Sequence, residues 1–336
     1  MMEFELHLLN DFQHDFPLVP APFSAIAGRL GVSEARVLAM LAQLQARGMV
    51  SRVGAVFRPH SIGSSALAAM ALPSDKLDEV AGLVSAYAEV NHNYEREHHF
   101  NLWFVVVADD EANLRAVLGE IESRSGYPVL HLPMLENYHI DLGFDLLQSR
   151  QGGRRDEHRS AATPRAAARG MLTQTAETAL IRAIQQGFPL VPRPFAVIGE
   201  EIGLTEGEVI AGLADLVGQG VIKRMGVVVR HHELGYRANA MVVWDIPDAQ
   251  VAALGRCIGQ FDFVTLCYRR PRRLPGWRYN LFSMIHGCDR DAVLALVEDM
   301  RQRCDLLAFP HEVLFSCRRF KQRGAHYVAA AAGVAA

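Results

Sequence analysis

The chain has 336 residues, of which 50% are hydrophobic and 21% are charged, a balance typical of a folded globular protein rather than a disordered one. Its 34 basic and 37 acidic residues give a formal net charge of −3, which does not favour a protein that coats nucleic acid. The sequence has no apolar run of about 18 residues and no visible secretory signal, so we expect no membrane span.

Five cysteines lie in the C-terminal third of the chain: Cys257, Cys267, Cys288, Cys304 and Cys317. Their number is odd and none of them forms a C-x-x-C pair. This pattern favours free thiols in a reducing compartment over a disulfide framework. We therefore expect a cytoplasmic protein with five free thiols.

The chain contains a tandem repeat. Phe16–Pro20 (FPLVP) recurs as Phe188–Pro192, and residues 16–63 match residues 188–235 at 22 of 48 positions. A polar stretch rich in Gly, Ala and Arg separates the two copies and is typical of a flexible linker. Each copy divides again where the hydrophobic periodicity changes. The predicted divisions are a winged helix-turn-helix (1–63), a ferredoxin-like domain (64–147), the linker (148–171), a second winged helix-turn-helix (172–235) and a second ferredoxin-like domain (236–327).

The start of each copy has the pattern of a winged helix-turn-helix. A first helix is predicted over 4–12, and two short helices over 22–48 are separated by Gly31 and capped by Ser33. The second of them ends at Gly48, and the alternating residues 49–57 predict the strands of a wing.

The second part of each copy predicts the β-α-β-β-α-β order of a ferredoxin-like domain. The fold class is therefore α+β, a tandem of two winged helix-turn-helix plus ferredoxin-like units that forms a pseudo-dimer. In the first half the expected strands are 66–72, 89–96, 99–108 and 128–135, and the expected helices are 74–86 and 110–123. The second half repeats this order from Ala238 to about Cys317.

One strand of the first half carries the best candidate site. Along residues 91–97 the side chains alternate, which places His92, Tyr94 and Arg96 on one face. Such a row is costly in a core without partners, so it indicates a polar pocket for an anionic ligand. After the turn at 97–98, His99, Asn101 and Trp103 are expected on the next strand. There Asn101 and the indole of Trp103 can face the same pocket.

The second half keeps part of this row. Tyr268 and Arg270 match Tyr94 and Arg96, and Asn280 matches Asn101, but Leu266 stands where the first half has His92. The loop 271–277 is five residues longer than its counterpart and adds Arg272, Arg273 and Trp277. We therefore expect the first half to contain the proton donor and the second half to be a reduced site.

Several residues in and near these rows have more than one interpretation. The cluster of His92, His98 and His99 either forms part of the site or consists of ordinary surface or core histidines. Its spacing matches no common zinc site, so no metal is expected. Tyr138 and His139 either close over a ligand or pack against the helix-turn-helix. His60 and His232, next to Gly63 and Gly235, fit a turn or capping role.

Longer motifs resemble a known family. The paired domains resemble AsnC/Lrp-type transcription regulators, and His92–Phe104 (HNYEREHHFNLWF) resembles the signature of the siroheme decarboxylases. Residues 138–144 resemble the D-type ending of that family. Residues 267–271, 279–282 and 320–323 resemble its L-type, so the chain looks like a fused D–L form.

The resemblance implies removal of carbon dioxide from acetate side chains of siroheme, giving didecarboxysiroheme in haem d1 biosynthesis. It implies no cofactor beyond the iron that siroheme carries, and companion subunits of the G- and H-types. We assign the catalytic roles to His92, His99, Tyr94 and Arg96, with His92 the first choice of proton donor and His99 or His98 the second. The expected substrate-binding residues are His98, Asn101, Trp103, Tyr268, Arg269, Arg270, Arg273 and Asn280.

A transcription regulator and a non-enzymatic tetrapyrrole sensor remain the alternatives. A DNA-binding helix needs Lys or Arg against the phosphates. The candidate recognition helix of the first half (residues 34–47) has two arginines, and that of the second half (206–216) has three acids and no base. Specific DNA binding is therefore not expected.

Overall fold

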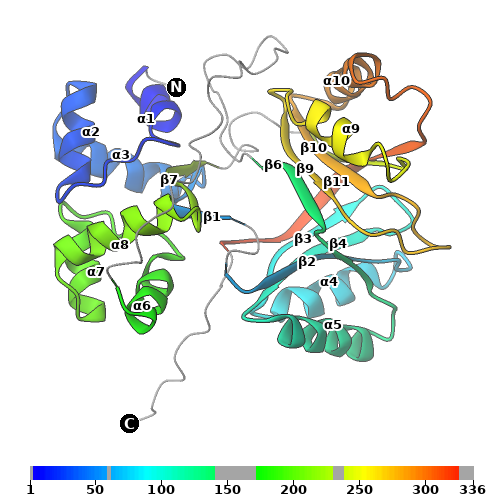
Figure 1. The fold of residues 1–336 in the computed structure, drawn as a ribbon, viewed down its shortest axis with the longest axis horizontal. Helices are drawn as coiled ribbons and strands as arrows, with labels where there is room; N and C mark the ends of the chain where they lie inside the picture. The colour runs from blue at the N-terminus through cyan, green and yellow to red at the C-terminus, as the bar shows by residue number, and fades with distance from the viewer. Residues whose placement is uncertain (1–2, 59–61, 141–171, 230–237, 325–336) are drawn as a thin grey trace.

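The computed structural model describes residues 3–58, 62–140, 172–229 and 238–324. Within these residues the elements form two bodies, a helix-turn-helix body and a sheet body (Figure 1). No helix in these four ranges is long and apolar enough to cross a membrane. The predicted linker, His60, His232 and the C-terminal tail lie outside the described residues.

The helix-turn-helix body contains both copies of the repeat. Ser33 caps its helix by accepting a hydrogen bond from the Arg36 amide, and Gly31 and Gly48 take positive φ, as the sequence predicts. The elements of the first copy are α1 (Glu3–Asp11), α2 (Pro22–Leu30), α3 (Glu34–Ala46) and β1 (Val50–Phe57). Those of the second copy are α6 (Gln174–Ile184), α7 (Pro194–Ile202), α8 (Glu206–Gly218) and β7 (Ile222–Val229).

The two copies share one core instead of each closing its own. The predicted strand over 49–57 is present as β1, and it pairs antiparallel with β7 of the other copy in a two-stranded sheet. Phe16 and Phe188, from the two copies of FPLVP, pack with ring centroids 5.7 Å apart. A Cβ on Gly226 would lie 2.3 Å from the Phe12 carbonyl oxygen, so this repeated glycine allows the two copies to approach closely. The repeated motif therefore serves the contact between the copies.

The sheet body contains two ferredoxin-like units, each in the predicted order. The first consists of β2 (Ser64–Met70), α4 (Leu77–Ala86), β3 (Val90–Arg96), β4 (Leu102–Ala108), α5 (Glu111–Ser125) and β5 (Leu130–Pro133). The second consists of β8 (Ala238–Trp244), α9 (Val251–Ile258), β9 (Val264–Arg269), β10 (Leu281–Gly287), α10 (Arg290–Arg303) and β11 (His311–Gln322). A further strand, β6 (Glu136–Ile140), follows β5.

The strands join in one nine-stranded sheet of order β5-β2-β4-β3-β11-β8-β10-β9-β6. Each half extends its last strand onto the other half, since β11 pairs with both β8 and β3, and β6 pairs with β9. Only residues 134–135 separate β5 from β6, so the two ends of the sheet are brought back together. The sheet folds into two layers with α4 and α5 on one outer face and α9 and α10 on the other (Figure 1).

A third core fills the space between the two layers. It contains large aromatic side chains from both halves, including Trp103, Tyr268, Trp277 and Phe282. The outer cores lie under the helices, one in each half. The inner face of β3 borders the central core, so the His92 row lies where the two halves meet.

Candidate functional site

The β3 strand presents its two faces to different surroundings, as the alternation predicts. On the outer face the Asn93 amide donates to the Ala81 carbonyl and to the Ser85 hydroxyl, both at 3.0 Å, beneath α4. On the inner face Arg96 reaches across to the other half. His92 and Tyr94 stack along the same face with ring centroids 6.2 Å apart. The structure therefore brings His92, Tyr94 and Arg96 together.

Arg96 is a buried cation. Its side chain is 6% exposed, Nη1 donates to the Leu314 carbonyl oxygen at 2.9 Å, and the guanidinium lies 5.9 Å from the Tyr94 ring centroid. Burial lowers the pKa of Arg96 to about 10, which still leaves it charged at neutral pH. No carboxylate of the described residues forms an ion pair with it. A buried and uncompensated positive charge is costly and is well suited to an anionic ligand.

His92 is half-buried at the end of the row that lies toward the helix-turn-helix body. Burial, with a smaller contribution from the charge of Arg52, lowers the pKa of His92 from 6.5 to about 4. The ring is therefore neutral at neutral pH in the unliganded protein. A role as proton donor requires a bound anion that raises this pKa.

The other two histidines of the cluster lie apart from this row. His98 Nδ1 accepts the Phe100 amide proton at 2.9 Å, which leaves the proton of the neutral ring on Nε2, 2.9 Å from Glu312 Oε2. Burial lowers the pKa of His98, although Glu312 opposes this effect. His99 is exposed and packs edge-on against Phe100 in the turn, so the expectation that it lies on the next strand is wrong, because β4 begins only at Leu102.

The two predicted asparagines have their amides engaged with backbone. Asn101 bonds the amide and the carbonyl of Leu72, at 3.0 and 2.8 Å, and Asn280 does the same with Ile246. Trp103 donates its indole N–H to the Phe100 carbonyl at 2.6 Å. The side-chain amides of Asn101 and Asn280 and the indole N–H of Trp103 therefore hold the strand ends. The polar atoms of Asn101 and Trp103 are bonded to backbone groups and do not face a ligand, contrary to the expectation.

The second half repeats the arginine contact. Arg270 donates to the Leu132 carbonyl, as Arg96 does to Leu314, and its guanidinium lies 4.5 Å from the Tyr268 ring centroid. A pocket of about 220 Å³ opens beside it, lined by Leu135, Asp248, Arg269, Arg270, Pro271, Arg272 and Asn280. Asp248 pairs with both Arg269 and Arg272, and the bond from Arg272 is the main cause that lowers the pKa of Asp248. Arg273 lies outside this pocket and donates to the His131 carbonyl at 3.0 Å.

Three acidic residues that pair with histidine or arginine near the site were not predicted from the sequence: Asp245, Asp248 and Glu312. Glu312 joins the halves, since it contacts His98 and accepts the Tyr279 hydroxyl proton at 2.5 Å. Arg272 is neutralised by Asp245 and Asp248, so it is less available to a ligand than its sequence position indicates. The described residues hold no group of three His, Cys, Asp or Glu side chains arranged for a metal ion.

Two comparisons by sequence cover the chain. Residues 62–139 and 233–321 match the family model of the AsnC-like ligand binding domain, and residues 5–50 and 177–223 match that of the siroheme decarboxylase NirDL-like HTH domain. The siroheme decarboxylase NirDL subunit of Paracoccus denitrificans (strain Pd 1222) is 43% identical over 97% of both chains. The chain belongs to the siroheme decarboxylase NirDL family. It is therefore an enzyme, a carboxy-lyase.

Two further relatives are similar to this NirDL-family chain. A solved structure of siroheme decarboxylase NirDL in co-complex with an iron-uroporphyrin III analogue is 30% identical, with a TM-score of 0.68, and covers 97% of this chain and 94% of that one. The siroheme decarboxylase NirH subunit of Paracoccus pantotrophus is 47% identical over 43% of this chain and 90% of its own length. That subunit therefore corresponds to a single half of this chain.

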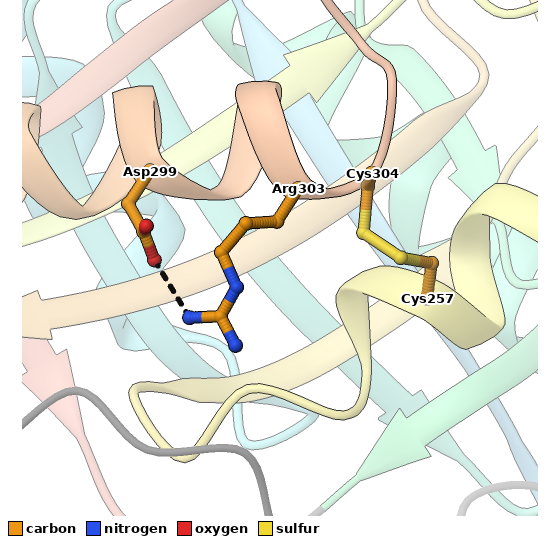
Figure 2. The surroundings of a disulfide bond; sticks show 4 residues. All are labelled: Cys257, Asp299, Arg303 and Cys304. Atoms are coloured by element: carbon orange, nitrogen blue, oxygen red, sulfur yellow. Dashed lines mark hydrogen bonds and ion pairs between the residues drawn. A yellow bond between two sulfur atoms is a disulfide. The ribbon is translucent and has the colours of Figure 1, made fainter.

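Two structural features of this NirDL-family chain differ from the sequence-based expectations. Cys257 and Cys304 form a disulfide between the ends of α9 and α10, so the prediction of five free thiols is wrong for this pair (Figure 2). Cys267, Cys288 and Cys317 are free. Tyr138 lies on β6, and a Cβ on Gly255 would be 2.1 Å from its ring, so Tyr138 packs against α9 and not against the helix-turn-helix.

Proposed function

We propose that this chain removes carbon dioxide from acetate side chains of siroheme and so gives didecarboxysiroheme for haem d1 biosynthesis, acting in the cytoplasm. The observation that carries the proposal is the buried Arg96, which lies beside Tyr94 and His92 and forms no ion pair with an acid among the described residues. A macrocycle edged with carboxylates supplies the missing negative charge, and a guanidinium binds a carboxylate by two parallel hydrogen bonds.

In this mechanism the bond that breaks joins the acetate methylene carbon to its carboxyl carbon. Carbon dioxide leaves, and the electron pair stays on the methylene carbon, where the conjugated ring delocalises it. A proton then adds to this carbon and leaves a methyl group. The iron and the electron sink both belong to siroheme, so the protein needs to supply only binding, orientation and the proton.

We assign the proton to His92. In the unliganded protein its pKa is about 4, but carboxylates of a bound polyanion next to the ring raise that value and favour the charged, proton-donating form. Tyr94, stacked on His92, orients the ring or relays the proton. Arg96 anchors a carboxylate that stays on the product. His98 holds the turn through Glu312 and is the weaker candidate for donor.

Companion subunits are part of the proposal. Single-half relatives such as the NirH subunit correspond to one half of this chain, so G- and H-type subunits have the surfaces of the same fold with which to associate. The test is anaerobic incubation of the protein with siroheme, alone and together with those subunits, followed by mass spectrometry of the tetrapyrrole. Loss of carbon dioxide supports the proposal, and unchanged siroheme in both samples contradicts it.

A further inference from the structure

The pocket beside Arg270 lies at the end of β9 and is rich in arginine. Three cationic side chains and one acidic side chain are among its lining residues: Arg269, Arg270, Arg272 and Asp248. Its volume of about 220 Å³ is below the range of about 300–1,000 Å³ that holds drug-sized ligands. The pocket therefore suits a small anion or one acidic side chain of a larger ligand, and not a whole macrocycle.

Arg270 is the buried cation of this pocket. It is 7% exposed, donates through Nη1 to the Leu132 carbonyl, and lies 4.5 Å from the Tyr268 ring centroid. No carboxylate of the described residues forms an ion pair with Arg270. Its Nε and that of Arg269 are buried and have no hydrogen-bond partner within these residues. Buried guanidinium groups with unused donors are unfavourable by themselves and favour a bound anion.

The other polar groups of the pocket meet on the carboxylate of Asp248. Its Oδ1 accepts hydrogen bonds from Arg269 Nη2 at 3.1 Å, from Arg272 Nη1 at 2.9 Å and from Asn280 Nδ2 at 3.1 Å. Three donors on one oxygen, two of them charged, are the arrangement by which a protein holds the carboxylate of a ligand. Asp248 therefore stands in for such a group.

The donors are better fixed than the carboxylate that they hold. Asp248 lies in the turn between β8 and α9, and its side chain is 66% exposed. Asn280 is buried and bonds the backbone of Ile246, and Arg272 is also held by Asp245 at 2.8 Å. An exposed ion pair contributes little to stability, so Asp248 can turn into solvent at low cost while the donors stay in place.

This donor set belongs to the second half alone. Ser74 stands where the second half has Asp248, two residues after the position whose amide and carbonyl an asparagine bonds in each half. Glu95 stands where the second half has Arg269, and it pairs with Arg318 on β11. The second half has therefore exchanged an acid for a base at this corner of the sheet.

We infer that this pocket is a carboxylate-binding site, which Asp248 occupies in the unliganded protein and leaves when the carboxylate of a ligand takes its place. The incoming group accepts the same three hydrogen bonds and adds a negative charge beside the buried Arg270. The carboxylate belongs either to a side chain of siroheme or to a separate small acid. The first source rests on the proposed function, and the second does not.

The test measures the binding of two probes to the full-length protein: iron-uroporphyrin III by absorbance and succinate by isothermal titration. Asp248→Asn removes the competing charge and keeps the shape, and Asp248→Ser introduces the residue type of Ser74. Both are expected to tighten the binding of at least one probe about threefold to tenfold. Arg269→Gln should weaken the binding of the same probe about tenfold or more.

Asp78→Asn is the matched control, because Asp78 is an exposed aspartate of the first half that pairs with Arg318. It removes the same charge and should leave both affinities unchanged. Circular dichroism and thermal unfolding show whether each variant is folded.

The two probes separate the sources of the carboxylate. Tighter binding of iron-uroporphyrin III alone assigns the pocket to a tetrapyrrole side chain, and tighter binding of succinate assigns it to a separate small acid. If folded Asp248→Asn and Asp248→Ser bind neither probe more tightly than wild type and Asp78→Asn do, the inference is overturned. A wild type whose succinate binding responds in this way but which leaves siroheme unchanged would overturn the proposed function and support this inference.

Discussion

The Arg96 guanidinium donates to the carbonyl oxygen of Leu314, 218 residues later in the chain, at 2.9 Å. Arg270 makes the equivalent contact with Leu132 in the opposite direction. Each half therefore sends its buried arginine onto a strand of the other half, Arg96 onto β11 and Arg270 onto β5. The candidate site exists only because β11 crosses from the second half to β3 of the first.

Replacing Arg96 by alanine is expected to lower the affinity for siroheme about tenfold to a hundredfold, because hydrogen bonds to charged groups contribute about 1.5–3 kcal/mol. Arg318→Ala is the matched control on the neighbouring strand. Arg318 is exposed and already paired with Asp78 and Glu95, so its loss should change the free energy of unfolding by less than about 1 kcal/mol and leave affinity unchanged. Isothermal titration measures both. Equal affinities of the two variants would contradict the assignment.

Lowering the pH is expected to destabilise the unliganded protein through His92. Its pKa is 6.5 when unperturbed and about 4 in the fold, so between these values the unfolded chain binds the proton first. The contribution of His92 to stability is complete above about pH 6.5 and is lost as the pH falls toward 4. His92→Gln should flatten this dependence in urea unfolding measured across that range. It will not abolish the dependence, because burial also lowers the pKa of His98, His131 and His311.

Breaking the disulfide is expected to destabilise the second half. Cys257 and Cys304 are separated by 47 residues, and a loop of that length gives a stabilisation of about 2–4 kcal/mol. Cys304→Ser should lower the free energy of unfolding by this amount under non-reducing conditions. Cys288→Ser, at an exposed free cysteine, is the control and should have little effect. If reductant leaves the unfolding curve of the wild type unchanged, the disulfide contributes no stability.

Sequence-specific DNA binding is not expected. The two arginines at the first recognition helix are engaged, since Arg36 lies over the Phe4 ring and Arg47 pairs with Glu5 at 3.0 Å. α8 carries no Lys or Arg, and its Glu208 caps its own first turn. A mobility-shift assay at low salt with a random-sequence duplex library should give no selected sequence. A tight complex with one sequence would instead favour a regulator.

Local patterns predicted the helices and the row on β3, because capping residues, glycines and side-chain alternation act within a few residues. Ser33 and Gly31 mark real helix ends, and His92, Tyr94 and Arg96 do share a face. The repeat, read from FPLVP, indicated a pseudo-dimer, and Phe16 and Phe188 do meet.

The contacts between the halves were not predictable in the same way. The pairing of β1 with β7, of β11 with β3 and of β6 with β9 joins segments far apart in the chain, and no local pattern specifies such partners. The burial of Trp277 depends on the path of the hairpin over 271–277. The sequence shows the length of this hairpin but not that it folds back into the sheet body. The same holds for Cys257 and Cys304, which are brought together only by the packing of α9 and α10 (Figure 2).

The most direct measurement is single-turnover conversion of siroheme under anaerobic conditions, with His92→Ala compared with Leu266→Ala, the substitution at the equivalent position of the second half. We expect His92→Ala to slow the loss of carbon dioxide by about a hundredfold or more, as removal of a general acid does, while Leu266→Ala converts siroheme at the wild-type rate. The wild-type rate should fall with rising pH as the bound His92 loses its proton. Conversion by His92→Ala at the wild-type rate, with both variants folded, would contradict the assignment of His92 as the proton donor.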